Sequence, residues 1–120
     1  MGFERENNLY RKILAFARDI VVFFRELENS KFEKEINKQL LRSGTSIGAN
    51  VSEAQGSISE ADYISKIHIA YKELLETKYW IDLIRETKGI TEEKYESLNS
   101  QINELSKILK TIIKNINSKK

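Results

Sequence analysis

Apolar residues recur along this chain at alternating intervals of three and four positions, which is the period of one face of an α-helix. Proline is absent and the 120 residues include only five glycines, so little in the chain would interrupt long helices. The connections between the apolar segments are short, and short connections make consecutive helices antiparallel. We therefore predict one all-α domain over residues 1–120, an antiparallel up-down-up-down four-helix bundle. Its predicted helices are residues 5–28, 31–55, 58–87 and 91–117.

Capping signals set these helix boundaries. The segments Ser30–Glu33 and Ser57–Glu60 have the form of a capping box, in which a serine hydroxyl accepts a hydrogen bond from a helix amide and the glutamate reciprocates. Thr91 precedes two glutamates and is predicted to begin the last helix. Gly56 and Gly89 stand where a left-handed residue would end the preceding helix.

Each predicted helix has one apolar face, and the four faces together would form the core. The predicted core residues are Leu9, Ile13, Phe16, Ile20, Phe24 and Leu27; Phe32, Ile36, Leu40, Ile47, Val51 and Ala54; Tyr63, Ile67, Ala70, Leu74, Ile81 and Ile84; and Tyr95, Leu98, Ile102, Leu105, Leu109, Ile112 and Ile116. The first helix has more apolar surface than a bundle contact requires, because its apolar arc covers about half of the circumference. The wider arc adds Tyr10, Leu14, Ala17, Val21 and Phe23.

Surplus apolar surface on a helix is typical of a subunit contact. The third predicted helix also has apolar residues outside its core face, namely Ile69, Trp80 and Leu83, and these are the predicted interface residues. We therefore expect a homo-oligomer. A compact monomer with a few exposed apolar side chains is the alternative, since such exposure is common.

The segment RSGTSIGANVSEAQGS, residues 42–57, is rich in small residues and raises the question of a phosphate-binding loop. Gly44 and Gly48 match neither GxxxxGK[ST] nor GxGxxG, and no strand is predicted before them. The apolar period continues through the segment, so we predict helix there. Small residues on a helix would let a neighbouring helix approach closely.

A polar line runs beside the apolar face of the second predicted helix, and polar residues at comparable spacing lie beside the face of the third. We predict that the two lines form a hydrogen-bonded network that fixes the register of the two helices. Its predicted members are Gln39, Arg42, Ser46, Asn50, Glu53, Lys66 and Glu73, with Ser43 and Thr77 in the same lines. A ligand or catalytic pocket built on Glu53 and Glu73 is the alternative.

Residues 39–83, QLLRSGTSIGANVSEAQGSISEADYISKIHIAYKELLETKYWIDL, resemble the four-helix-bundle proteins encoded in intervening sequences of bacterial 23S rRNA genes. The similarity extends over about residues 8–112, with two departures: Gly48 stands where many members have proline, and the net charge is only +2. The residues that carry the resemblance are Gln39, Arg42, Ser46, Ile47, Asn50, Val51, Glu53, Gly56, Ala70, Glu73, Leu74 and Glu76.

This resemblance implies a bacterial protein that forms a homopentamer and has no established activity, in a family whose members often carry the name of a ribosomal protein. The related accessory proteins of diversity-generating retroelements form a basic pentamer that binds a reverse transcriptase and nucleic acid. The expected partners are therefore further copies of the chain and, through basic surface, RNA or a ribonucleoprotein.

Basic residues form two groups that would carry such binding. They are Arg11, Arg18 and Arg25, which recur every seven residues on the first predicted helix, and Lys107, Lys110 and Lys114, which follow the last acidic residue. Repeated by the symmetry of an oligomer, each group would bind phosphates in a salt-dependent manner. The alternatives are an ordinary solvated face and, for the whole protein, a scaffold that binds only other proteins.

The chain offers few groups for catalysis or metal binding. It has no cysteine, which excludes disulfides, zinc-thiolate sites and iron-sulfur clusters, and its single histidine, His68, excludes sites that need two. Lys72 lies one turn after His68, so a phosphotransfer or hydrolytic enzyme is a remote alternative. We expect a non-enzymatic protein without cofactor or metal. The longest apolar run, residues 20–24, is too short to cross a membrane, so we expect a cytoplasmic location.

Overall fold

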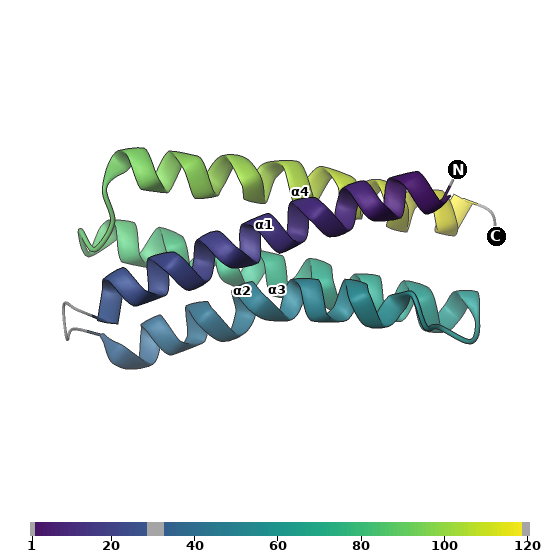
Figure 1. Ribbon diagram of the computed structural model, residues 1–120, viewed down its shortest axis with the longest axis horizontal. Coiled ribbons are helices and arrows are strands. Elements are labelled where there is room, and N and C mark those ends of the chain that lie inside the picture. Colours follow the sequence, from purple (N-terminus) through teal and green to yellow (C-terminus); the bar gives the residue numbers. More distant parts are fainter. Residues whose placement is uncertain (1, 29–32, 119–120) are drawn as a thin grey trace.

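The computed structural model describes residues 2–28 and 33–118 of the chain, with side chains from residue 8 onward. This described part is all-α and contains no strand. Its helices are α1 (Gly2–Glu28), α2 (Lys34–Ala54), α3 (Glu60–Glu86) and α4 (Glu92–Ser118). They lie side by side in an elongated molecule of 47 × 23 × 22 Å (Figure 1).

The four helices run along the long axis of the molecule with their ends aligned. Figure 1 shows that α1 begins and α4 ends at one end of the molecule, where α2 also passes into α3. At the opposite end α1 ends, α2 begins and α3 passes into α4. The most extensive contact is between α2 and α3, and the least extensive is between α1 and α4, while the described residues of α2 and α4 make no contact. The helix pair α2 and α4 is therefore diagonal.

The sequence predicts the number and approximate ends of the helices correctly. The predicted ends of α1, α3 and α4 lie within three residues of those observed. Residues 31 and 32, where the second helix is predicted to begin, and the predicted cap at Ser30 lie outside the described residues. Thr91 caps α4 as predicted, because its hydroxyl accepts a hydrogen bond of 3.1 Å from the amide of Lys94.

The cap of α3 lies two residues later than predicted. The hydroxyl of Ser59 accepts a hydrogen bond of 3.0 Å from the amide of Asp62, and the amide of Ile58 donates to the Asp62 carboxylate at 3.3 Å. Ser59 is thus the N-cap, and Asp62 accepts from the amide one residue before it, whereas the predicted cap Ser57 has a buried hydroxyl without a partner among the described residues. An aspartate three residues after Ser59 supplies the reciprocal acceptor that Glu60 was expected to supply after Ser57.

The predicted left-handed conformation of Gly56 and Gly89 is wrong. Neither glycine has a positive φ, and Lys88 adopts the left-handed conformation instead, with φ of 61°. The amide of Gly89 donates to the Ile84 carbonyl at 2.8 Å, and the amide of Lys88 donates to the Arg85 carbonyl at 3.0 Å. These two hydrogen bonds form a Schellman motif in which lysine occupies the position that usually favours glycine.

The apolar faces of all four helices meet in one core, as the sequence predicts. One residue of α1 is assigned incorrectly, because Phe23 is 3% exposed and lies in the core while Phe24 is only half-buried. Strict alternation of four and three residues from Leu9 onward leads to Phe23 and not to Phe24. The predicted core residues Ile36, Tyr63 and Ile112 lie at the edge of the core, and Phe32 lies outside the described residues.

Two glycines let α1 pack closely on α2. A Cβ atom at Gly44 would lie 2.8 Å from Cγ2 of Ile20, and one at Gly48 would lie 2.9 Å from Cγ2 of Ile13. Both isoleucines are buried in the core, so neither branched side chain is free to move away. Residues 44–48 are helical, as predicted, and the two glycines at the ends of this stretch allow the approach.

Gly44→Ala is expected to destabilise the protein. Overpacking against Ile20 costs about 1–3 kcal/mol. Alanine offsets roughly 1 kcal/mol of this cost, because it has a higher helix propensity than glycine. The net loss of unfolding free energy, about 1 kcal/mol, can be measured by urea denaturation followed by circular dichroism at a fixed protein concentration. Gly56→Ala is the control, because the nearest atom to its Cβ would be 3.6 Å away. Equal stability of the two variants would contradict the close approach.

Candidate functional site

A polar seam joins α2 to α3 around Arg42. The Arg42 guanidinium donates hydrogen bonds to the carboxylates of Glu73, at 2.7 Å, and Glu76, and its Nε donates to the amide oxygen of Gln39 at 3.2 Å. These bonds raise the pKa of Arg42, and the bond to Glu73 contributes more than the bond to Glu76. The indole of Trp80 donates to Glu76 at 3.0 Å, and the bonds from Trp80 and Arg42 lower the pKa of Glu76.

Three hydroxyl groups continue the seam inward. The hydroxyl of Ser46 donates to the Glu73 carboxylate, so this carboxylate binds both a cation and a hydroxyl of α2. The hydroxyls of Ser43 and Thr77 lie 2.8 Å apart, and Thr77 also lies 2.8 Å from the Glu73 carbonyl oxygen. Ser43 and Thr77 are both fully buried. Every polar group at the centre of the seam therefore has a partner, as burial requires.

The seam contains most, but not all, of the residues that the sequence places in it. At its far end Lys66 pairs with Glu53 at 3.1 Å, separately from the Arg42 cluster. Asn50 does not cross between the helices, because its side chain donates to the Ser46 carbonyl within α2 at 2.9 Å. Glu76 and Trp80 are members that the predicted network omits. Their spacing of three and seven residues from Glu73 could have indicated them, since these positions share a helix face.

The seam has the chemistry of a structural clamp. Glu53 and Glu73, which could have formed a pocket, are each bound by a cation from the neighbouring helix. Within the described ranges no group of acidic or histidine side chains is arranged to hold a metal ion. A cavity of about 360 Å³ lies at the opposite end of the molecule, where Phe23, Ile84 and Lys94 contribute to its walls. The pocket alternative on Glu53 and Glu73 thus has no support in this geometry.

A second polar cluster joins α3 to α4 near their connection. The hydroxyl of Tyr95 donates to Asp82 at 2.7 Å, and Nζ of Lys78 lies 2.9 Å from both. Burial opposes the charge on Lys78 and on Asp82, but the hydrogen bonds that each makes with Tyr95 and with the other outweigh it, raising the pKa of Lys78 and lowering the pKa of Asp82. Arg85 stacks on the Tyr95 ring at 4.1 Å and forms two hydrogen bonds with Glu92. This cluster was not predicted from the sequence.

Exposed apolar side chains lie on α1 and α3. On α1, Tyr10 is 49% and Leu14 is 55% exposed. With the half-buried Ala17 and Val21 they form a line at intervals of four and three residues, the α1 apolar row. Of the predicted interface residues on α3, Ile69 is exposed, Leu83 is half-buried and Trp80 packs against the core. Two further exposed residues, Leu75 and Tyr79, were not predicted.

The two predicted basic groups are exposed and lie on neighbouring helices. They are the α1 arginine row (Arg11, Arg18 and Arg25) and, on α4, Lys107, Lys110 and Lys114. The facing sides of α1 and α4 are marked by the contacts of Lys12 with Glu104, at 2.5 Å, and of Asp19 with Gln101, at 3.1 Å. Each basic group lies about a third of a turn further round its own helix. Because α1 and α4 run in opposite directions (Figure 1), these turns bring both groups to the outer side of the helix pair, with Lys107 closest to Arg11 along its length.

His68 lies exposed on α3, and Lys72, one turn later, is exposed as well. Among the described residues no hydrogen bond or ion pair joins either of them to another side chain.

None of the helices is long and apolar enough to cross a membrane over the part of the chain that the structure describes.

Fold and surface together define an all-α protein of four long helices held by polar clusters between neighbours. Comparison with known families matches residues 5–111 to the 23S rRNA-intervening sequence proteins. The chain belongs to this family, so the resemblance noted in the sequence is confirmed.

A crystal structure of a protein from Bacteroides thetaiotaomicron VPI-5482 is similar to the chain. That protein has unknown function and comes from the S23 ribosomal protein family. The two chains are 48% identical with a TM-score of 0.87, and the match covers 91% of this chain and 97% of the other. The comparison with curated proteins found no match. Neither the family nor the structural neighbour indicates an enzymatic activity.

Thr77→Val tests whether the buried hydroxyl pair holds α2 and α3 together. The change removes the partner that Ser43 has on α3 and leaves its hydroxyl only a long contact, 3.4 Å, with the Leu40 carbonyl, so we expect the unfolding free energy to fall by about 1–2 kcal/mol. Adding Ser43→Ala removes that hydroxyl, and the double variant should lose less than the sum of the single changes. Thr111→Val, on the exposed surface of α4, is the control, with an effect within about 0.5 kcal/mol. Strictly additive urea-denaturation energies would contradict a direct coupling.

Proposed function

We propose that the protein is a non-enzymatic, self-associating, single-domain four-helix bundle that binds RNA through exposed arginine side chains. The α1 apolar row is the observation that carries the self-association. Tyr10 and Leu14 are large and about half exposed, and they continue into two further apolar positions along the helix. Contact with another copy would remove this row from water, which is a favourable change of about 25 cal/mol per Å² of apolar surface.

A closed ring requires two different surfaces on each copy, and α3 supplies the second. Ile69, Trp80 and Leu83 occupy one side of α3, the side that also carries Glu73 toward α2. The α1 apolar row of one copy would pack on this side of α3 of the next. The family resemblance favours five copies. Within each copy, the four helices are consistent with an antiparallel up-down-up-down bundle. We place the protein in the cytoplasm, and none of its described helices is a candidate membrane span.

The α1 arginine row supports RNA binding. All three arginines are exposed, and only Arg18 has a carboxylate partner within the described residues, the adjacent Asp19 at 3.2 Å. Guanidinium groups bind phosphates in a bidentate manner, and a ring would repeat the row around its circumference. The family description refers to 23S rRNA, and the structural neighbour comes from a ribosomal protein family.

The self-association is tested by light scattering after size-exclusion chromatography at micromolar concentration. The wild-type protein should have a mass that is a multiple of 14.0 kDa. Tyr10→Ser combined with Leu14→Ser should shift the mass toward one chain. Val22→Ser combined with Ile58→Ser is the matched control, because these residues are exposed and apolar but lie outside the row. A wild-type mass of 14.0 kDa would overturn the proposal.

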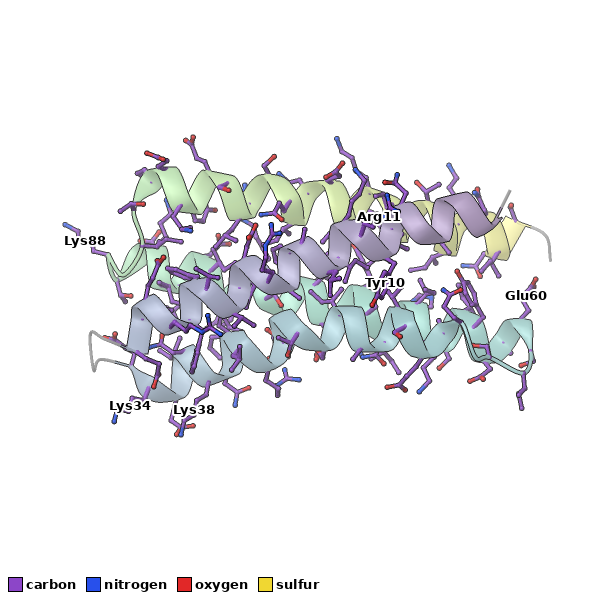
Figure 2. The ribbon with its side chains drawn as sticks, in the orientation of Figure 1. Tyr10, Arg11, Lys34, Lys38, Glu60 and Lys88 are labelled. Carbon is purple, nitrogen blue, oxygen red and sulfur yellow. The ribbon has the colours of Figure 1, made fainter. Side chains whose placement is uncertain are left out.

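RNA binding is tested with labelled fragments of 23S rRNA at about 50 and 200 mM salt. Replacing Arg11, Arg18 and Arg25 by glutamine should weaken binding and lower the salt slope by about 0.7–0.9 for each phosphate that the protein no longer binds. Replacing Lys34, Lys38 and Lys88 by glutamine removes the same charge from exposed sites on α2 and the α3–α4 connection (Figure 2), outside the row, and should have a small effect. Equal losses of affinity in the two variants would contradict a role for the row.

Two other outcomes would favour the alternative functions. Absence of RNA binding at low salt, with self-association intact, would favour a scaffold that binds only proteins. A phosphotransfer or hydrolytic activity that is lost in His68→Ala would favour an enzyme.

A further inference from the structure

The solvent-facing side of α4 carries one unbroken row of polar residues. At alternating intervals of three and four positions it presents the outer stripe of α4: Glu93, Glu96, Ser100, Asn103, Lys107, Lys110 and Lys114. All seven residues are exposed. Within the described part of the chain, none of the seven side chains has a hydrogen bond or an ion pair. The stripe is therefore a helix face without a partner.

The charges along the stripe are ordered, with two acids at its beginning, two neutral residues in its middle and three lysines toward its end. Other carboxylates of α4 are paired within the chain, Glu92 with Arg85 and Glu104 with Lys12. Like charges three or four residues apart destabilise an isolated helix, so the order does not serve α4 itself. The helix dipole accounts only for Glu93, because its effect is confined to the terminal turns and no basic residue lies in the last turn.

We propose that the outer stripe of α4 binds the same stripe of a second copy of this chain, running in the opposite direction. Centred on Asn103, this alignment places Glu93 opposite Lys114 of the second copy and Glu96 opposite Lys110, and each pair occurs twice by two-fold symmetry. Ser100 lies opposite Lys107, and Asn103 lies opposite itself. The paired stripe is about 31 Å long, from the helix rise of 1.5 Å per residue. A parallel alignment would place like charges together.

The edge of α3 adds an apolar border to this contact. Leu75 precedes Lys78 and Asp82 by three and seven residues, so it lies on the side of α3 that faces α4 through the Tyr95 cluster. Leu75 and the neighbouring Tyr79 are 49% and 57% exposed. The two-fold axis is perpendicular to the plane of the two paired α4 helices. It therefore keeps α3 of both copies on the same side of that plane. The apolar residues of both copies would then flank the ion pairs, which individually contribute little when they are exposed.

This contact goes beyond the proposed function, because it uses a surface on the diagonal opposite α2, away from the α1 apolar row. It therefore remains available in a copy that is already part of a ring. It also assigns Lys107, Lys110 and Lys114 to a second protein chain rather than to RNA, and that alternative is an outcome of the test below.

The test uses charge reversal, with a disulfide as the readout. The chain has no cysteine, so Asn103→Cys places a single thiol at the centre of the stripe. Two further variants carry this cysteine, one with Glu93→Lys and Glu96→Lys, the other with Lys110→Glu and Lys114→Glu. Each reversed stripe has charges of one sign at both of its ends and should repel its own copy, reducing the association constant about tenfold or more. A mixture of the two variants restores opposite charges at every reversed pair and should form the mixed disulfide dimer.

Cross-linking is measured under mild oxidation, at low and high salt, with tags of different size on the two variants. Ser52→Cys, exposed on α2, is the control thiol and should give no dependence on these charges. The proposal is overturned if the mixture cross-links no better than each variant alone. It is also overturned if the reversed variants change only their affinity for RNA, which would assign the lysines to phosphate binding. Introducing the charge changes into the Tyr10→Ser and Leu14→Ser background separates a failure here from a failure of the α1 contact.

Discussion

The contact of α1 with α2 at two glycines is the constraint on which the exposed surfaces of this protein depend. Because Ile20 and Ile13 lie directly over Gly44 and Gly48, α1 can neither rotate nor move outward without opening the core. The helical period then fixes which side of α1 faces solvent. Tyr10 and Leu14 follow residues of the buried face by one position, about 100° round the helix, and are left half exposed.

The α2–α3 pair is held by a different kind of interaction. Arg42 lies between two carboxylates that are three residues apart on α3, and Ser43 meets Thr77 in the core below. A shift of one helix by one turn would separate the buried Ser43 and Thr77 hydroxyls, at a cost of about 1–3 kcal/mol for a buried polar group that loses its partner. Polar seams of this kind determine register, whereas the apolar core determines only that the helices pack.

Much of this fold could be predicted from the sequence, because one rule, the spacing of apolar residues, determines both the helices and their inner faces. The same rule identified the polar seam, since Gln39, Ser46 and Glu73 lie at regular offsets from the core positions. What could not be predicted depends on a choice between neighbours. Two such choices are the core phenylalanine of α1, Phe23 or Phe24, and the cap of α3, Ser57 or Ser59. The candidates have the same residue type, so only the packing of the complete fold selects one of each.

Exposure was harder to predict than burial for a related reason. Leu75 and Tyr79 lie on α3 among charged residues, and nothing in their spacing distinguishes them from residues that a fourth helix would cover. The lysine at the end of α3 shows the same limit for the backbone. Lys88 takes the left-handed conformation because Gly89 must donate to Ile84, so the hydrogen bonds of the motif decide the position and override residue preference.

The contacts that each helix makes within the bundle explain why α4 is the helix with a free polar face. α2 contacts both α1 and α3, and its two sides carry the glycine contact and the Arg42 seam, so little of it is available to a partner. α4 is joined to α3 by a polar cluster near their connection, and its contact with α1 is the least extensive of the helix contacts. A helix so placed needs few outward residues for the stability of its own chain. The order of charges along its outer side is therefore free to serve recognition. A row that is acidic at one end and basic at the other is complementary to an antiparallel copy of itself. It is less complementary to the uniformly negative backbone of a nucleic acid.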